Sequence, residues 1–306
     1  MDKKPYVIFN VSGGIGKNIM ATAVVSSIKK RYPEHNLIVV CPYPEVFINN
    51  PEIYRVFKSG ITPYFMEDYI HDDTIILMAD PYQHDSFVHK KKHLIEVWCD
   101  TFNVKCESLT NNLFLTSAEI QFAREKFTRK KPLFVIQTSG GSGGGKWNYS
   151  WSRDIPINQA QQIVNIMTET HHVMHVRRKN QPSLNNCEWV EADLRELFGL
   201  IYISDKRLFN ESFGYHAAAA FNLPSTVCFI GTKPDVYSYP MHHNILPKED
   251  HPQFIHGIDK YMEDSPWGGE KLYECPYNIN NLFSITQIIE SIQNQKTPNK
   301  NILTFN

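Results

Sequence analysis

Short apolar runs alternate along the chain with longer segments in which apolar residues recur at helical spacing. Several runs have the length and composition of buried strands: residues 6–11, 37–41, 74–79, 133–137 and 173–176. The intervening segments predict helices over residues 18–31, 93–102, 117–127, 158–170 and 193–198, with shorter ones at 45–48 and 51–57. Strands that alternate with helices in this way indicate an α/β fold with doubly wound parallel sheets.

The alternation is interrupted once, near the middle of the chain. Residues 129–132 (RKKP) are typical of a linker, and a new strand begins directly after them. Both halves open with a strand, a glycine-rich loop and a helix. We therefore predict two similar α/β domains, residues 1–130 and 131–306, facing each other across a cleft. An amphipathic helix at residues 284–293 is a candidate to pack back on the first domain.

The composition adds limits on partners and location. The 306 residues are 42% hydrophobic, with a net charge of −1. This balance gives no general attraction to nucleic acid or anionic membranes, although local basic runs leave an anionic acceptor open. Six cysteines without a C-x-x-C pair indicate reduced thiols. With neither a signal peptide nor a membrane-spanning run in the sequence, we predict a cytoplasmic protein without stable membrane insertion.

The strongest local pattern of the second half lies in residues 199–231. Its first five residues, 199–203, are expected to end a buried strand, and a helix is expected at 214–221 with Asn210 or Ser212 as its cap. A helix N-terminus at the carboxyl end of a parallel sheet suits a phosphate or diphosphate. An ordinary strand–helix–strand unit, with His216 in the core, explains the same pattern.

A glycine-rich loop follows the first strand of each half. Residues 12–18 (SGGIGKN) approach a phosphate loop, but Val11 and Asn18 stand where that signature needs Gly and Ser or Thr. A tight turn that brings the first helix close to a ligand fits better, and an ATP-binding P-loop protein is the alternative. Residues 138–146 (TSGGSGGGK) favour a ligand-facing anion-binding loop, because Trp147 and Trp151 follow closely.

The sequence favours neither a zinc site nor a hydrolase. The histidines at 171, 172, 175, 242 and 243 lack the spacing of a zinc site. The sequence also shows no signature of a Cys/His catalytic dyad, which disfavours a hydrolase. We expect neither a metal nor a cofactor.

Two motifs, one in each half, resemble the ADP-heptose:lipopolysaccharide heptosyltransferase family. Residues 13–33 (GGIGKNIMATAVVSSIKKRYP) are similar to its G-x-I-G-D opening and the helix after it. Residues 211–231 (ESFGYHAAAAFNLPSTVCFIG) are similar to its D-S-x-x-x-H-x-A-A-A-x-G-x-P motif at the same spacing. The helix at 193–201 and the tryptophan turn at 150–156 add weaker likenesses.

The resemblance implies a GT-B architecture, in which two Rossmann-like doubly wound domains face a central cleft. It implies a nucleotide-diphosphate sugar as donor on the C-terminal domain, an acceptor on the N-terminal domain, and inverting, metal-independent transfer. Glu211 takes the place of the family's aspartate. The residues that would contact the donor are Gly14, Gly16, Ser139, Gly140, Lys146, Ser212, Phe213, Gly214 and His216.

One departure from the family concerns the general base. The acidic residue of its first loop, a candidate base, is Lys17 here, and an ammonium is no base unless its pKa is strongly depressed. Either another carboxylate takes over, with Asp80 as candidate, or Lys17 binds an anionic part of a different acceptor. Asp80 is also explained as a turn residue before Pro81. Asp80, Lys17 and Glu211 are thus the candidate catalytic residues.

Two further questions stay open at this point. A GT-B module that binds nucleotide or glycan without turnover is a non-enzymatic alternative, because the family's acidic residue is lost. The acceptor could be a lipopolysaccharide core, another glycan, a protein or a modified nucleic-acid base.

Overall fold

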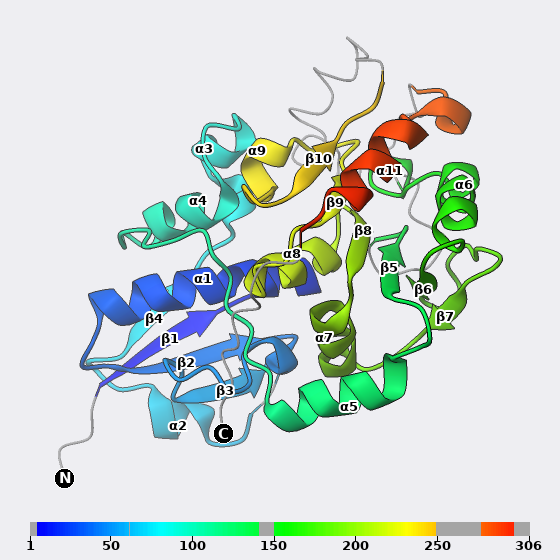
Figure 1. Ribbon diagram of the computed structural model, residues 1–306. Coiled ribbons are helices and arrows are strands. Elements are labelled where there is room, and N and C mark those ends of the chain that lie inside the picture. The colour runs from blue at the N-terminus through cyan, green and yellow to red at the C-terminus, as the bar shows by residue number, and fades with distance from the viewer. Residues whose placement is uncertain (1–4, 61, 141–149, 249–276, 297–306) are drawn as a thin grey trace.

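The computed structural model describes residues 5–60, 62–140, 150–248 and 277–296, which form two α/β lobes (Figure 1). Each lobe is built on a parallel sheet, as the alternating pattern predicted. Lys146 and Trp147 of the second glycine loop lie outside the described residues. No helix in the described part of the chain is long and apolar enough to cross a membrane.

The first lobe holds a four-stranded sheet in the order β3-β2-β1-β4. Helices α1 and α4 pack on one face, around Phe9 and Trp98, and α2 covers part of the other face with aromatic side chains. The elements in chain order are β1 (Tyr6–Asn10), α1 (Ile15–Arg31), β2 (Asn36–Cys41), η1 (Pro44–Val46), β3 (Arg55–Lys58), α2 (Phe65–Tyr69), β4 (Ile75–Met78), η2 (Pro81–Gln83), α3 (Asp85–Val88) and α4 (Leu94–Thr101).

The second lobe holds a six-stranded sheet in the order β10-β9-β8-β5-β6-β7. Helices α7 and α8 cover one face, and α6 and α11 cover the other. Its elements are α5 (Ser117–Phe127), β5 (Leu133–Gln137), η3 (Ser150–Ser152), α6 (Ile157–Met167), β6 (His172–Val176), β7 (Glu188–Val190), α7 (Leu194–Ile203), β8 (Lys206–Asn210), α8 (Phe213–Ala220), β9 (Thr226–Cys228), α9 (Pro234–Tyr237), β10 (His243–Ile245), η4 (Ile279–Asn281) and α11 (Ile285–Gln293).

Three predictions of local structure were wrong. No helix forms at 51–57: its last three residues belong to strand β3, which extends the sheet by pairing with β2. The run 199–203, expected as a strand, continues α7, because the capping box of Asp193 starts a helix that nothing interrupts before Ser204. The strand is the next segment, β8, although it carries Lys206 and Arg207.

The third error concerns α11. Its buried residues Ile288 and Ile292 fill the core between α6 and the second sheet, so this helix packs on its own lobe rather than on the first. The amphipathic pattern correctly predicted a helix. It could not say which apolar surface the helix covers.

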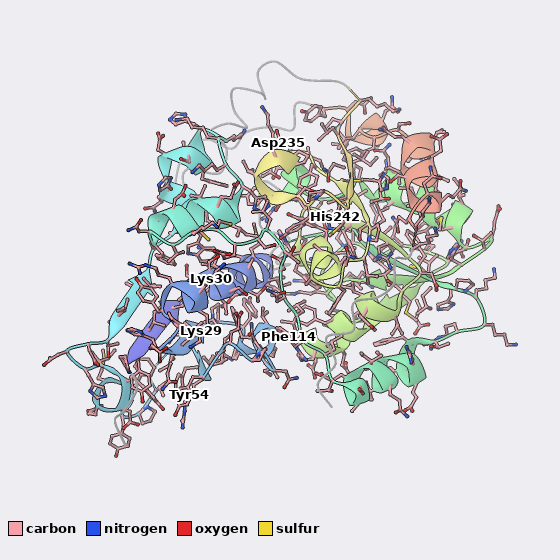
Figure 2. The ribbon with its side chains drawn as sticks, turned by 60° about the vertical axis from the view of Figure 1, so that its left-hand side comes forward. Lys29, Lys30, Tyr54, Phe114, Asp235 and His242 are labelled. Atoms are coloured by element: carbon pink, nitrogen blue, oxygen red, sulfur yellow. The ribbon has the colours of Figure 1, made fainter. Side chains whose placement is uncertain are left out.

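The two lobes meet along α1 and α8. Three consecutive alanines of α8, residues 217–219, are buried there, and one hydrophobic cluster runs through both lobes. A crossover segment, residues 103–116, joins α4 to α5, and Phe114 on it lies between the lobes in Figure 2. Arg195 of α7 reaches across to carbonyl oxygens of Glu45 and Phe114. These contacts set the relative position of the lobes.

Candidate functional site

A cavity of about 690 Å³ lies between the two lobes. Its walls come from the loop after β1, the loop after β5, and the starts of α1 and α8. Tyr82 and Tyr237 contribute one aromatic side chain from each lobe. The lining includes Gly13, Gly14, Gly16, Lys17, Tyr43, Tyr82, Gln137, Ser139, Arg153, Arg177, Glu211, Ser212, Phe213, His216 and Tyr237.

Helix α1 begins at the cavity without a capping side chain from the described residues. Gly14 is its N-cap, and its first turn contains no acidic residue. Gly13 has a φ of +85°, which favours glycine, and Asn18 closes the turn by donating to the carbonyls of Gly13 and Gly14 at 3.3 and 2.9 Å. The positive end of the α1 dipole therefore faces the cavity uncompensated by a first-turn acid.

Helix α8 begins at the same cavity, and within the described chain it too lacks a capping side chain. Its N-cap is Ser212, whose hydroxyl accepts a hydrogen bond from Gln137 at 3.1 Å instead of capping the helix. Gly214 packs tightly behind the first turn, since a Cβ there would lie 2.5 Å from the Phe209 ring. Two helix N-termini thus meet at one cavity, an arrangement suited to an anion.

The charged side chains around α8 add to this field. The Arg153 guanidinium lies 3.9 Å from the carboxylate of Glu211. Burial raises the pKa of Glu211, while Arg153 opposes that rise. Behind them, burial raises the pKa of Asp154 to about 6, and its carboxylate accepts a hydrogen bond from the Gly140 amide at 2.9 Å. Arg153 therefore places a cation beside Glu211, the residue that precedes the N-cap of α8.

His216 stands where the two helices touch. A Cβ on Gly16 would lie 2.9 Å from its ring, so the close approach of α1 requires glycine at that position. Burial, together with His93 and His242, holds the pKa of His216 well below its usual range. His216 therefore presents a neutral imidazole at the cavity at physiological pH.

Two of the candidate catalytic residues, Lys17 and Asp80, form an ion pair. The Lys17 ammonium lies 3.0 Å from Asp80 Oδ1 and 3.2 Å from the hydroxyl of Ser12, and it sits above the ring of Tyr82 at 4.9 Å. Asp80 also accepts a hydrogen bond from the Tyr82 amide, as expected of a turn residue. Its side chain is 43% exposed, whereas that of Lys17 is 3% exposed.

The pair has a consequence for the phosphate-loop hypothesis. In that motif the lysine must extend its ammonium to the phosphates. Here Lys17 lies inside α1 and its ammonium is bound to Asp80. The geometry therefore disfavours a P-loop.

The carboxyl ends of β6 and β7 and the start of α7 form another part of the cavity wall. The apolar residues Val176, Val190, Ala192, Leu194 and Leu197 lie there, together with Arg177, Arg178, Gln181 and Glu191. No sequence motif pointed to this wall, although the position after a buried strand is a general signal.

The structure brings most of the predicted site residues together. Gly14, Gly16, Lys17, Ser139, Glu211, Ser212, Phe213 and His216 line the cavity. Gly140 and Gly214 pack against residues of its wall, and Asp80 is bound to Lys17. The sequence reasoning did not select Tyr82, Gln137, Arg153, Arg177 or Tyr237, which also line it.

Two of these omissions could have been avoided. Arg177 belongs to a basic run that directly follows a strand, and Arg153 ends the aromatic stretch after the second glycine loop. Among the described residues, no group of three or more His, Cys, Asp or Glu side chains could hold a metal ion.

Comparison with known proteins supports the architecture. No family model matches the sequence, and no curated protein matches it. Solved structures do: a glycosyl transferase family 9 protein from Veillonella parvula superposes with a TM-score of 0.66 at 13% identity, over 94% of this chain and 96% of that one. The chain has the GT-B fold.

Two heptosyltransferases of Escherichia coli show the same likeness. The ADP-heptose lipopolysaccharide heptosyltransferase II has a TM-score of 0.63 at 12% identity, over 84% of this chain and 99% of that one. The dodecameric iron-containing heptosyltransferase TibC, solved with ADP-D-β-D-heptose, has a TM-score of 0.65 at 12% identity, over 95% and 76%. The GT-B prediction is confirmed, and so is the heptosyltransferase-like character of the fold.

Proposed function

We propose that this GT-B protein is a glycosyltransferase that takes a sugar from a nucleotide-diphosphate donor. The observation that carries the proposal is the meeting of two uncapped helix N-termini, those of α1 and α8, at one cavity beside Arg153. A diphosphate there would receive backbone N–H groups and a guanidinium. The resemblance to proteins that use ADP-heptose supports the same choice of donor class.

The donor would lie along the second lobe. Its diphosphate would contact the first turn of α8, at Ser212, Phe213 and Gly214, and its nucleoside would lie against the wall formed by the ends of β6 and β7. Burial raises the pKa of Glu211, and in its protonated form this carboxyl group could donate a hydrogen bond to a phosphate oxygen. These groups would stabilise the charge that develops on the departing diphosphate, so the transfer needs no metal ion.

The acceptor would approach from the first lobe. In an inverting transfer its hydroxyl oxygen attacks the anomeric carbon while a base removes the hydroxyl proton, and the diphosphate leaves with the electron pair of the broken C–O bond. We assign the base to Asp80, whose carboxylate is partly exposed and is oriented by Lys17. The acceptor could be a glycan, a lipopolysaccharide core or another polar molecule such as a modified nucleic-acid base.

A binding and turnover experiment tests this proposal. Nucleoside diphosphates and a panel of nucleotide sugars would be screened by thermal shift, and each binder would be followed for donor hydrolysis or transfer. We expect stabilisation by at least one nucleoside diphosphate and slow release of it from the matching sugar donor. The proposal fails if none of these compounds binds.

A second candidate function is a GT-B module that binds nucleotide or glycan without turnover. The ion pair between Lys17 and Asp80 favours it, because Asp80 Oδ1 already accepts hydrogen bonds from the Lys17 ammonium and the Tyr82 amide. Measurable hydrolysis of a bound nucleotide sugar by the purified protein would exclude this alternative. Hydrolysis of Mg-ATP that is lost in Lys17→Met would instead revive the P-loop hypothesis.

A further inference from the structure

A chain of buried hydrogen bonds lies behind the cavity wall, where the crossover segment passes α8. Asn111 of the crossover segment is fully buried. Its Nδ2 donates to the backbone carbonyl of His216 at 3.2 Å and to Oη of Tyr239 at 2.6 Å. Tyr239 Oη in turn lies 2.7 Å from Nδ1 of His216. The three side chains connect a residue outside the cavity to one in its wall.

The direction of each bond follows from which atoms carry protons. The carbonyl of His216 can only accept, so Asn111 must turn its NH₂ group toward it, and the second N–H of that group points to Tyr239. Tyr239 Oη accepts this bond and donates its single proton to Nδ1. Nδ1 is thus the unprotonated nitrogen, and Nε2 carries the proton of the neutral ring.

The protonated nitrogen is on the cavity side of the ring. A Cβ added to Gly16 would lie 3.3 Å from Nε2, and both Gly16 and His216 line the cavity. The opposite tautomer would present a lone pair at the same place. A lone pair there would repel the oxygen of an anionic ligand, whereas the N–H donates to it.

The crossover segment that carries Asn111 is hydrogen-bonded to helix α1. The amide of Asn112 donates to the Thr22 hydroxyl at 2.8 Å, and the amide of Glu107 donates to the Ser27 hydroxyl at 3.2 Å. Both hydroxyls belong to α1. The position of Asn111 is therefore fixed by the helix whose N-terminus faces the cavity.

We propose that Asn111 and Tyr239 are positioning residues that hold His216 in its Nε2–H form, so that the ring donates a hydrogen bond to an anionic group in the cavity. The consequence for donor binding rests on the proposed function. The tautomer itself does not, because it follows from hydrogen bonds present without a ligand.

The tautomer can be read in the full-length protein by ¹⁵N NMR of labelled histidine side chains, without any ligand. We expect Nε2 of His216 to be the protonated nitrogen in the wild type. In Asn111→Asp the carboxylate can only accept, so Tyr239 must donate to it and accept from Nδ1–H, which reverses the tautomer. Tyr239→Phe removes the donor to Nδ1 and is expected to give a mixture. Tyr215→Phe is the matched control, since the hydroxyl of this neighbouring buried tyrosine has no hydrogen-bond partner among the described residues.

Binding of ADP, UDP and inorganic pyrophosphate, measured by calorimetry, tests the consequence. We expect the Kd of whichever probe binds the wild type to rise about tenfold in Asn111→Asp and Tyr239→Phe, the loss expected for one hydrogen bond to a charged group, with no change in Tyr215→Phe. A protonated Nδ1 in the wild type would overturn the assignment, and an altered tautomer with unchanged Kd would overturn the donation to an anion. If the tautomer is as stated but no probe binds the wild type, the proposed function fails and the positioning assignment stands.

Discussion

The contact between α1 and α8 can be tested by adding a single methyl group at Gly16. In Gly16→Ala the new Cβ would lie 2.9 Å from Cδ2 of His216, 3.3 Å from its Nε2 and 3.7 Å from the Cα of Phe213. The His216 ring has little room to retreat, because it is 4% exposed and its Nδ1 is bound to Tyr239. The two helices must therefore separate or the ring must leave its hydrogen bond.

The expected cost follows from the kind of misfit. Inserting a methyl group into a tightly packed contact destabilises a protein by about 1–3 kcal/mol. The helix propensity of alanine over glycine offsets up to about 1 kcal/mol of this, because Gly16 lies within α1. We expect Gly16→Ala to lower the free energy of unfolding by about 1–2 kcal/mol, and to weaken nucleoside-diphosphate binding because the moved ring lines the cavity.

Urea unfolding followed by fluorescence measures the first effect, and calorimetric titration with ADP and UDP measures the second. Gly14→Ala is the matched control, because a Cβ at Gly14 meets nothing within 4 Å among the described residues. It should change stability by less than about 1 kcal/mol, the scale of an N-cap substitution. Equal stability of the two variants, with equal affinity for the nucleotide, would refute the proposed tight contact.

Three further outcomes follow from the site. Asp80→Asn should lower kcat by about 100-fold or more, as expected for loss of a general base, with little change in the donor KM, whereas the exposed Asp85→Asn should leave kcat unchanged. Arg153→Ala, which removes the cation beside Glu211, should weaken ADP or UDP binding by about tenfold or more in a calorimetric titration, since it would remove the proposed charge-assisted contact to the diphosphate. Burial lowers the pKa of His242 to about 3 from an ordinary 6.5, so the unfolded chain takes up this proton first as the pH falls. The stability of the wild type relative to His242→Gln should therefore decline below pH 6.5 by about 1.4 kcal/mol per pH unit, measured as urea midpoints between pH 7 and 5.

The sequence predicted the fold well because the alternation of apolar runs and helical segments is a local signal. Its failures occurred where tertiary contacts decide. Strand β8 contains Arg207, which a sequence pattern assigns to the surface, yet this side chain is fully buried and donates to the carbonyls of Ser204 and Pro224. Only the folded chain shows that these carbonyls are available. The sequence pattern also failed to assign residues 199–203 to helix α7. An uninterrupted apolar segment has no clear period, so it does not distinguish a helix from a strand.

The candidate site was predictable to the extent that it depends on helix starts. Gly16 and Ser212 could be chosen because glycine and serine occur where a helix begins after a buried strand. Contacts between segments distant in sequence, such as those of Asn111 with His216 and Tyr239, leave no mark in a local pattern. Arg153 had a local signal, because it ends the aromatic stretch after the second glycine loop, but only the folded chain shows that it lies beside Glu211.

Lys17 stands where the heptosyltransferase family has an acidic residue, and its ion pair with Asp80 explains how a lysine is accommodated there. Lys17 lies in the first turn of α1, where a cation is unfavourable beside the positive end of the helix dipole by about 0.3–1 kcal/mol. The ion pair with Asp80 offsets this cost and draws a carboxylate to the start of the helix. The first lobe thereby keeps an acid near the position at which the heptosyltransferase family has one. This acid comes from the segment after β4 instead of the loop after β1. Because Lys17 balances the charge of that acid, the pair adds no net negative charge to the cavity. A diphosphate beside α8 would therefore be repelled less by the first lobe than if position 17 carried a lone carboxylate.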